Sequence, residues 1–123
     1  MSNYSLEEKT RFIEDLNRRT KQIALDSIRL SKEIPKTEEG KIILRQLIRS
    51  ATSVGANYRA ACRGRSQAEY FAKLSITVEE ADEVLYWPEI LEESELVKAD
   101  LSGLKDEVTQ IVFILAIARK NTK

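Results

Sequence analysis

The chain has 123 residues, of which 20 are Lys or Arg and 20 are Asp or Glu, with no histidine and a single cysteine. This length suits one domain whose core is large enough to fold without disulfides or metal. The balanced charge excludes a global field that draws the chain to nucleic acid or an anionic membrane. The missing histidine excludes the commonest zinc, imidazole-base and catalytic-triad chemistries.

The sequence also indicates where the protein resides. No apolar segment of the signal-peptide type stands near the N-terminus, and the longest apolar run, residues 111–118, is far too short to span a bilayer. The lone Cys62 lies beside alanines in a helical pattern, which is typical of a buried packing thiol. We therefore expect a cytoplasmic protein with no membrane contact and no cofactor.

Four helices are predicted, and the first two are expected over about residues 6–33 and 37–63. Ser5 and Glu8 form a capping box at the first start, and Pro35 ends that helix because the residue before a proline is pushed out of the α region. The apolar stripe of the first helix is Phe12, Leu16, Ile23, Leu30 and Ile34. The core face of the second is Leu44, Leu47, Ile48, Ala51, Val54, Tyr58, Ala61 and Cys62.

The side of the second helix opposite its core face carries arginines spaced by four, ten and four residues. At 100° per residue, these intervals place the four side chains within about 40° of one line down the helix. Guanidinium groups match phosphate oxygens, so the row suits a nucleic-acid backbone; the alternative is a solvated or ion-paired face. The candidate nucleic-acid-binding residues are Arg45, Arg49, Arg59, Arg63 and, in the following turn, Arg65.

A third helix is expected over about residues 67–91, after Gly64 ends the second helix and a capping box of Ser66 and Glu69 begins the next. Pro88 is expected to kink or end it, because proline removes a backbone donor and crowds the preceding turn. Its main apolar stripe is predicted to be Phe71, Leu74, Val78, Ala81 and Leu85.

The third helix also carries a cluster of four carboxylates. Metal sites in four-helix bundles use Glu-x-x-His elements, which a chain without histidine cannot supply, so we predict no metal site. We expect some of the carboxylates to pair with the arginines of the second helix, within the subunit or across an interface. The cluster is Glu79, Glu80, Asp82 and Glu83.

The fourth helix is expected over about residues 98–120, and its apolar pattern predicts self-association. Its core positions are Leu101, Leu104, Val108, Ile111, Leu115 and Ala118. Residues 111–118 are apolar on every side, and in so small a protein this predicts a second surface that covers them. The fold class is therefore all-α, an up-and-down antiparallel four-helix bundle in one domain over residues 1–123.

The segment SATSVGANYRAACRGRSQAEYFAKLSITVEEADEVLYW, residues 50–87, resembles the 23S rRNA-intervening sequence proteins, which are encoded in insertions within bacterial large-subunit ribosomal RNA genes and also elsewhere. The resemblance extends more loosely over nearly the whole chain. The positions that carry it are Ser53, Val54, Asn57, Arg65, Ser66, Phe71, Lys73, Leu74, Glu80, Glu83 and Trp87.

This resemblance implies a bundle that assembles into a cyclic homopentamer and has no enzymatic activity. A relative of the family, the accessory variability determinant of diversity-generating retroelements, is a basic pentamer taken to bind nucleic acid and a reverse transcriptase. We therefore predict a non-enzymatic RNA-binding, DNA-binding or ribonucleoprotein scaffold protein without catalytic residues. The alternative is a protein-interaction module whose arginine row is structural and whose partner is another protein.

Overall fold

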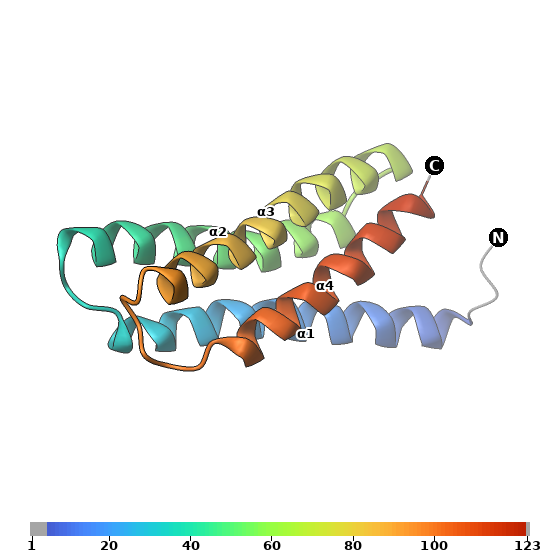
Figure 1. Cartoon of the computed structure of the whole chain (residues 1–123). Coiled ribbons are helices and arrows are strands. Elements are labelled where there is room, and N and C mark those ends of the chain that lie inside the picture. Colours follow the sequence, from blue (N-terminus) through green and yellow to red (C-terminus); the bar gives the residue numbers. More distant parts are fainter. Residues whose placement is uncertain (1–4, 123) are drawn as a thin grey trace.

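The computed structural model describes residues 5–122 and contains four α-helices, with no strand in that part of the chain. The helices are α1 (Leu6–Leu30), α2 (Glu38–Cys62), α3 (Gln67–Glu93) and α4 (Ser102–Lys120), and a 3-10 turn, η1 (Ser31–Glu33), extends α1. Consecutive helices run in opposite directions along the molecule (Figure 1). The predicted all-α class with four helices is confirmed.

Short-range capping sets the helix starts. The Ser5 side chain accepts the Glu8 backbone N–H at 3.1 Å, and the Glu8 carboxylate accepts the Ser5 N–H at 3.3 Å, which completes the predicted capping box. At the start of α3, the Ser66 hydroxyl accepts the Glu69 backbone N–H at 3.1 Å. These bonds satisfy amide donors that have no partner inside a first helical turn.

Two helix ends differ from the sequence expectation. The fourth helix begins at Ser102 and not near Lys98, and the Asp100 carboxylate accepts the Ser102 backbone N–H at 3.0 Å just outside it. The third helix stays α-helical through Pro88 and ends at Glu93. Pro88 is buried, so apolar packing compensates for the backbone donor that proline lacks.

The core lies along the facing sides of the helices and confirms much of the predicted pattern. The fully buried large side chains include Leu16, Ile23, Leu47, Val54, Tyr58, Leu74, Val84, Leu91, Val108, Ile111 and Leu115. Two predicted core residues are wrong, because Phe12 and Phe71 are exposed near the starts of their helices. The buried residues of α3 include Thr77 and Val84, which are not in its predicted apolar stripe. The helix is therefore rotated about its axis relative to the prediction.

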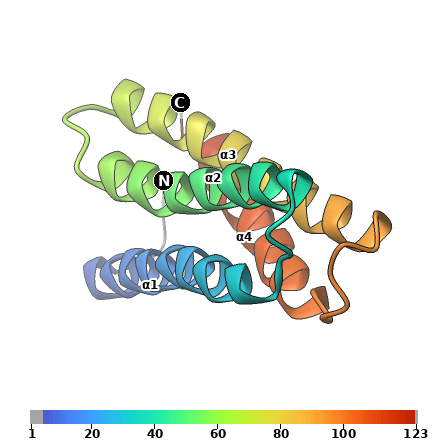
Figure 2. The same ribbon diagram turned by 90° about the vertical axis from the view of Figure 1, so that its left-hand side faces the viewer.

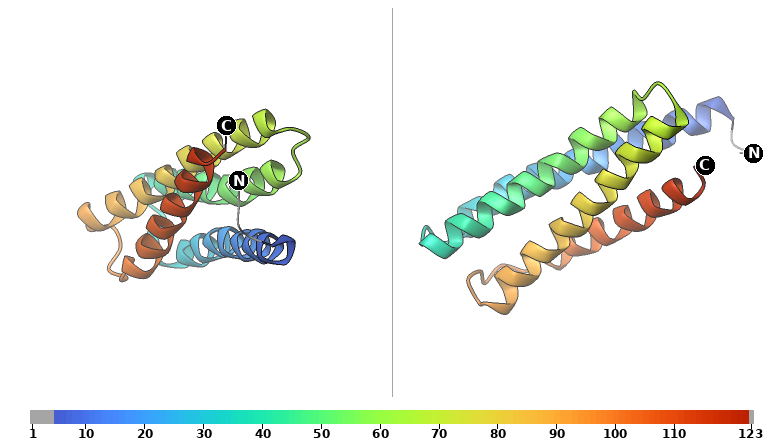
Figure 3. Two further views of the ribbon diagram at one scale, coloured as in Figure 1. Left: turned by 90° about the vertical axis from the view of Figure 1, so that its right-hand side faces the viewer. Right: turned by 90° about the horizontal axis from the view of Figure 1, so that it is seen from above.

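The helices pack unequally. Packing is most extensive between α2 and α3, and α2 lies between α1 and α3 (Figure 2). Of the four substantial α-helix pairs, α1 and α4 make the slightest contact. The C-terminal half of α4 rises away from the N-terminal half of α1 (Figures 1 and 3). This end of the bundle is therefore incompletely closed.

One ion pair joins α1 to α4. The Arg19 guanidinium donates from Nε to Glu107 Oε2 at 2.9 Å and from Nη2 to Glu107 Oε1 at 2.8 Å, and Nη2 also reaches the Gln110 side-chain oxygen at 3.1 Å. This hydrogen bonding by Arg19 holds the pKa of Glu107 below its ordinary value of 4.5. The two-pronged geometry makes the pair stronger than a single surface contact.

We expect the stability that this pair contributes to disappear in acid. The folded protein has the lower Glu107 pKa, so ionised Glu107 favours folding; the contribution is complete above the ordinary pKa and is lost as the pH falls through the lowered value. A Glu107→Gln variant should lower the free energy of unfolding by about 1 kcal/mol at pH 7. Urea unfolding from pH 7 to pH 3 should show this difference shrinking below about pH 4. A constant difference would contradict the assignment.

Candidate functional site

The exposed side of α2 carries the arginines predicted from the sequence. All five are exposed, and they lie on the side of the helix away from its buried residues. Arg63 caps the end of α2, and Arg65 stands in the turn before α3. We call this surface the arginine face, defined as Arg45, Arg49, Arg59, Arg63 and Arg65.

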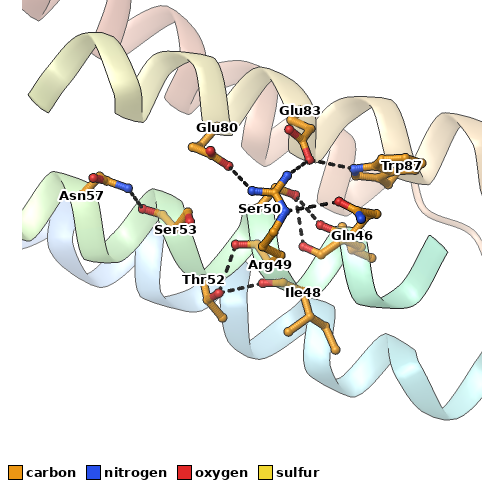
Figure 4. A network of polar contacts seen from close by, with 11 residues as sticks. Gln46, Ile48, Arg49, Ser50, Thr52, Ser53, Asn57, Glu80, Glu83 and Trp87 are labelled. Atoms are coloured by element: carbon orange, nitrogen blue, oxygen red, sulfur yellow. Dashed lines mark hydrogen bonds and ion pairs between the residues drawn. The ribbon is translucent and has the colours of Figure 1, made fainter. Parts of the chain in front are cut away.

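Arg49 is held by carboxylates of α3 (Figure 4). Its Nη1 donates to Glu80 Oε2 at 3.4 Å, and its Nη2 donates to Glu83 Oε2. The Trp87 indole N–H also donates to Glu83 Oε2, at 3.1 Å. The Trp87 hydrogen bond, followed by that of Arg49, holds the pKa of Glu83 below its ordinary value. The expected pairing between the arginines and the carboxylate cluster is confirmed for this residue.

The rest of the arginine face is arranged differently. Within residues 5–122, none of its other four arginines has a carboxylate oxygen within 4.0 Å. The arginine face is therefore partly paired: Arg49 forms ion pairs, and its other four arginines do not within residues 5–122. Arg49 ties α2 to α3, and its charge is outweighed locally by two carboxylates. The remaining guanidinium groups can offer their donors to an external anion.

The sequence interpretation missed one basic residue of this surface. Lys41 is exposed one turn before Arg45, at the same four-residue interval that separates Arg45 from Arg49. A second signal was also available, because the chain contains no Asp or Glu from Gly40 to Ala68. This acid-free stretch spans α2 after its first turn and the turn that follows the helix, so the acidic side chains of α2 are confined to Glu38 and Glu39 at its start.

Charge is divided between the two central helices. The chain contains no Lys or Arg from Leu74 to Val97, and this stretch carries eight carboxylates. Two of them bind Arg49, and Glu92 pairs with Lys105 of α4. The zero net charge of the chain therefore conceals a basic α2 beside a strongly acidic α3, with the remaining positive charge on the rest of the chain. An anion is therefore attracted to the basic side of α2 and repelled by the acidic stretch of α3.

The described residues also contain possible metal ligands and a single thiol. Among residues 5–122, no cluster of three or more His, Cys, Asp or Glu side chains is arranged to hold a metal ion. Burial raises the pKa of the half-buried Cys62 thiol, which disfavours the nucleophilic thiolate. No helix within these residues has an apolar stretch long enough to cross a bilayer.

A separate apolar surface lies where α1 and α4 diverge. Phe113 is 67% exposed, Ile117 55% and Phe12 46%. A hollow of about 910 Å³ opens between the helices, and its apolar lining is Phe12, Ile13, Tyr70, Ile114, Ile117 and Ala118. The exposed apolar side chains within residues 111–118 are therefore Phe113 and Ile117, and a second surface could cover them.

Comparisons with known proteins give a family and one informative neighbour. Residues 14–116 match the family model of the 23S rRNA-intervening sequence protein. A crystal structure of a protein with unknown function from the S23 ribosomal protein family of Bacteroides thetaiotaomicron is 28% identical, with a TM-score of 0.78 over 89% of this chain and 98% of that one. No curated protein matches. The chain belongs to the 23S rRNA-intervening sequence protein family.

Proposed function

We propose that this protein is a non-enzymatic, self-associating four-helix bundle that binds RNA or another nucleic acid in the cytoplasm through the arginine face. One observation carries the proposal: four exposed arginines have no ion-pair partner among residues 5–122, and they stand on the acid-free stretch that comprises most of α2 and the turn after it. Arginine forks bind phosphate oxygens in pairs, and several forks on one side of a rigid helix suit a phosphate backbone. Membership of the family adds an association with ribosomal RNA genes.

We expect salt-dependent binding that loses part of its salt dependence when arginines are removed. Each phosphate contact contributes about 0.9 to the slope of log affinity against log salt. An Arg45→Ala, Arg63→Ala double variant should therefore flatten the slope by about two units. Fluorescence anisotropy with a structured RNA and with a duplex DNA, across a range of salt concentrations, measures both slope and affinity.

Arg49→Ala is the matched control for this experiment. It removes the same type of side chain from the same helix, but one that Glu80 and Glu83 already hold. This variant should keep most of the salt slope. Equal slopes for the double variant and the unmodified protein would contradict the proposal.

A second candidate function is supported by the same network. Arg49 joins α2 to α3, so at least one arginine of the face stabilises the fold. This is what we expect of a protein-interaction module whose arginine row is structural. On that alternative, the partner is a protein and nucleic acid does not bind even at low salt. The anisotropy experiment separates the two candidates.

We also propose that several copies assemble through α1 and α4 into a cyclic homo-oligomer, with the pentamer implied by the family resemblance as the expected size. The apolar side chains exposed on α4 and the hollow beside α1 support this assignment. Oligomers of identical chains commonly close into rings. A ring would repeat the arginine face around its circumference, and binding at several faces would raise the affinity for a long nucleic acid.

A further inference from the structure

Within residues 5–122, the basic side chains of α2 and the following turn that have no ion-pair partner form two separate groups. The first group is Lys41 and Arg45, and the second is Arg59, Arg63 and Arg65. Arg59 lies fourteen positions after Arg45 in the sequence (59 − 45). At a rise of about 1.5 Å per residue, the facing ends of the two groups are about 21 Å apart along the helix axis.

The stretch between the groups does not suit a phosphate. Its exposed side chains on this side of the helix include Thr52 and Ala56, which carry no charge. The one cation there, Arg49, lies against both Glu80 and Glu83, so the local sum is one positive and two negative charges. A phosphate above this stretch would meet net negative charge. We call it the central gap.

The spacing of the two basic groups distinguishes a single nucleic-acid strand that follows α2 from a double helix whose two backbones α2 crosses. A strand running along α2 would place phosphates over the central gap as well as over both groups, because consecutive phosphates of one strand are much closer together than the length of the gap; in a duplex, each strand carries one per about 3.4 Å of helix axis. The two backbones that border a groove are instead separated by a phosphate-free space. The major groove of B-form DNA is about 12 Å wide, and the phosphate groups that form its walls add to the span.

We infer that the ligand of the arginine face is a double helix, and that α2 lies across a wide groove with one basic group on each backbone. The inference rests on the proposed function and adds the structural class of nucleic acid. Thr52 and Ala56 then face the open groove, where no phosphate needs a cation. The shallow, wide minor groove of A-form RNA and the major groove of B-form DNA both offer this arrangement.

The test compares a 20-nucleotide strand, alone and annealed to its complement, in RNA and in DNA versions at matched salt. The duplex should bind at least about tenfold more tightly than the single strand. Arg45→Ala and Arg63→Ala should each lower the duplex salt slope by about 0.9, because each removes a contact to a different backbone. Arg29→Ala, which removes an exposed arginine of α1, should leave it unchanged.

A gain-of-charge variant examines the central gap directly. Thr52→Arg places a cation where a single strand would present phosphates and where a groove presents none. The slope for duplex should stay the same, whereas a strand that follows α2 would gain about 0.7. An increased slope, or single-strand binding as tight as duplex binding, overturns the inference and leaves the proposed function standing. Absence of binding to any of the four probes at low salt overturns both.

Discussion

A Gly40→Ala variant should be destabilised by about 3 kcal/mol, at the upper end of what an added methyl group costs in a packed site. Gly40 is buried in the first turn of α2, where its N–H binds the Thr37 side chain. A β-carbon at this position would stand 2.1 Å from the backbone carbonyl oxygen of Pro35. Because that oxygen belongs to the backbone, the α1–α2 connection must move. Thermal unfolding at fixed protein concentration should show the midpoint lowered by roughly 10 °C.

Gly55→Ala is the matched comparison and should have the opposite sign. A β-carbon on Gly55 would lie 3.6 Å from the nearest atoms of α1, the backbone carbon and oxygen of Thr20, which is ordinary contact. Alanine favours a helix interior over glycine by up to about 1 kcal/mol, so this variant should be slightly more stable. If Gly55→Ala lost as much stability as Gly40→Ala, the difference in the space available for a β-carbon at the two sites would be contradicted.

Replacing Phe113 and Ile117 with glutamate should prevent assembly without unfolding the bundle. The two side chains are 67% and 55% exposed in the single chain, so the fold itself depends little on them. Burial of both in an interface contributes about 3 to 5 kcal/mol, and two carboxylates there oppose association further. The dissociation constant of the oligomer should therefore rise at least about a hundredfold. Sedimentation velocity across a range of protein concentrations measures this change.

The control for this experiment is Ile42→Glu, on α2. Ile42 is 46% exposed, so the change adds a similar charge to a similarly accessible apolar side chain outside α1 and α4. It should leave the sedimentation of the protein unchanged, and circular dichroism should show the same helix content in all variants. An unmodified protein that sediments as a monomer at high concentration would contradict the proposed assembly.

Local rules of helix formation predicted much of this fold. Ser5, Ser66 and Pro35 mark chain positions where backbone donors need a cap or where the α conformation is disfavoured, and such signals act over four or five residues. Periodicity gave the buried face of α2 because close neighbours cover that helix on both sides. It failed for Phe12 and Phe71, which stand near helix starts. A periodic pattern defines a face, but not how far a neighbouring helix extends to cover it.

The candidate site could be predicted in outline only. The spacing of the arginines placed them on one side of α2, which depends on helix geometry alone. Which of them is paired depends on the rotation of α3, since Glu80 and Glu83 must point across the helix interface to reach Arg49. That rotation follows from burying Thr77, Val84 and Pro88, a choice that the amphipathic pattern of α3 does not determine.

The unequal packing of the helices has a consequence for the folding of the chain. The extensive interfaces join helices that follow one another directly: α1 with α2, α2 with α3, and α3 with α4. Each interface requires closure of a short connection, so little chain entropy is lost before native contacts form. Low contact order of this kind is associated with fast folding. The α2–α3 pair holds the whole arginine face, so we expect this face to depend on one local interface and not on contact between α1 and α4.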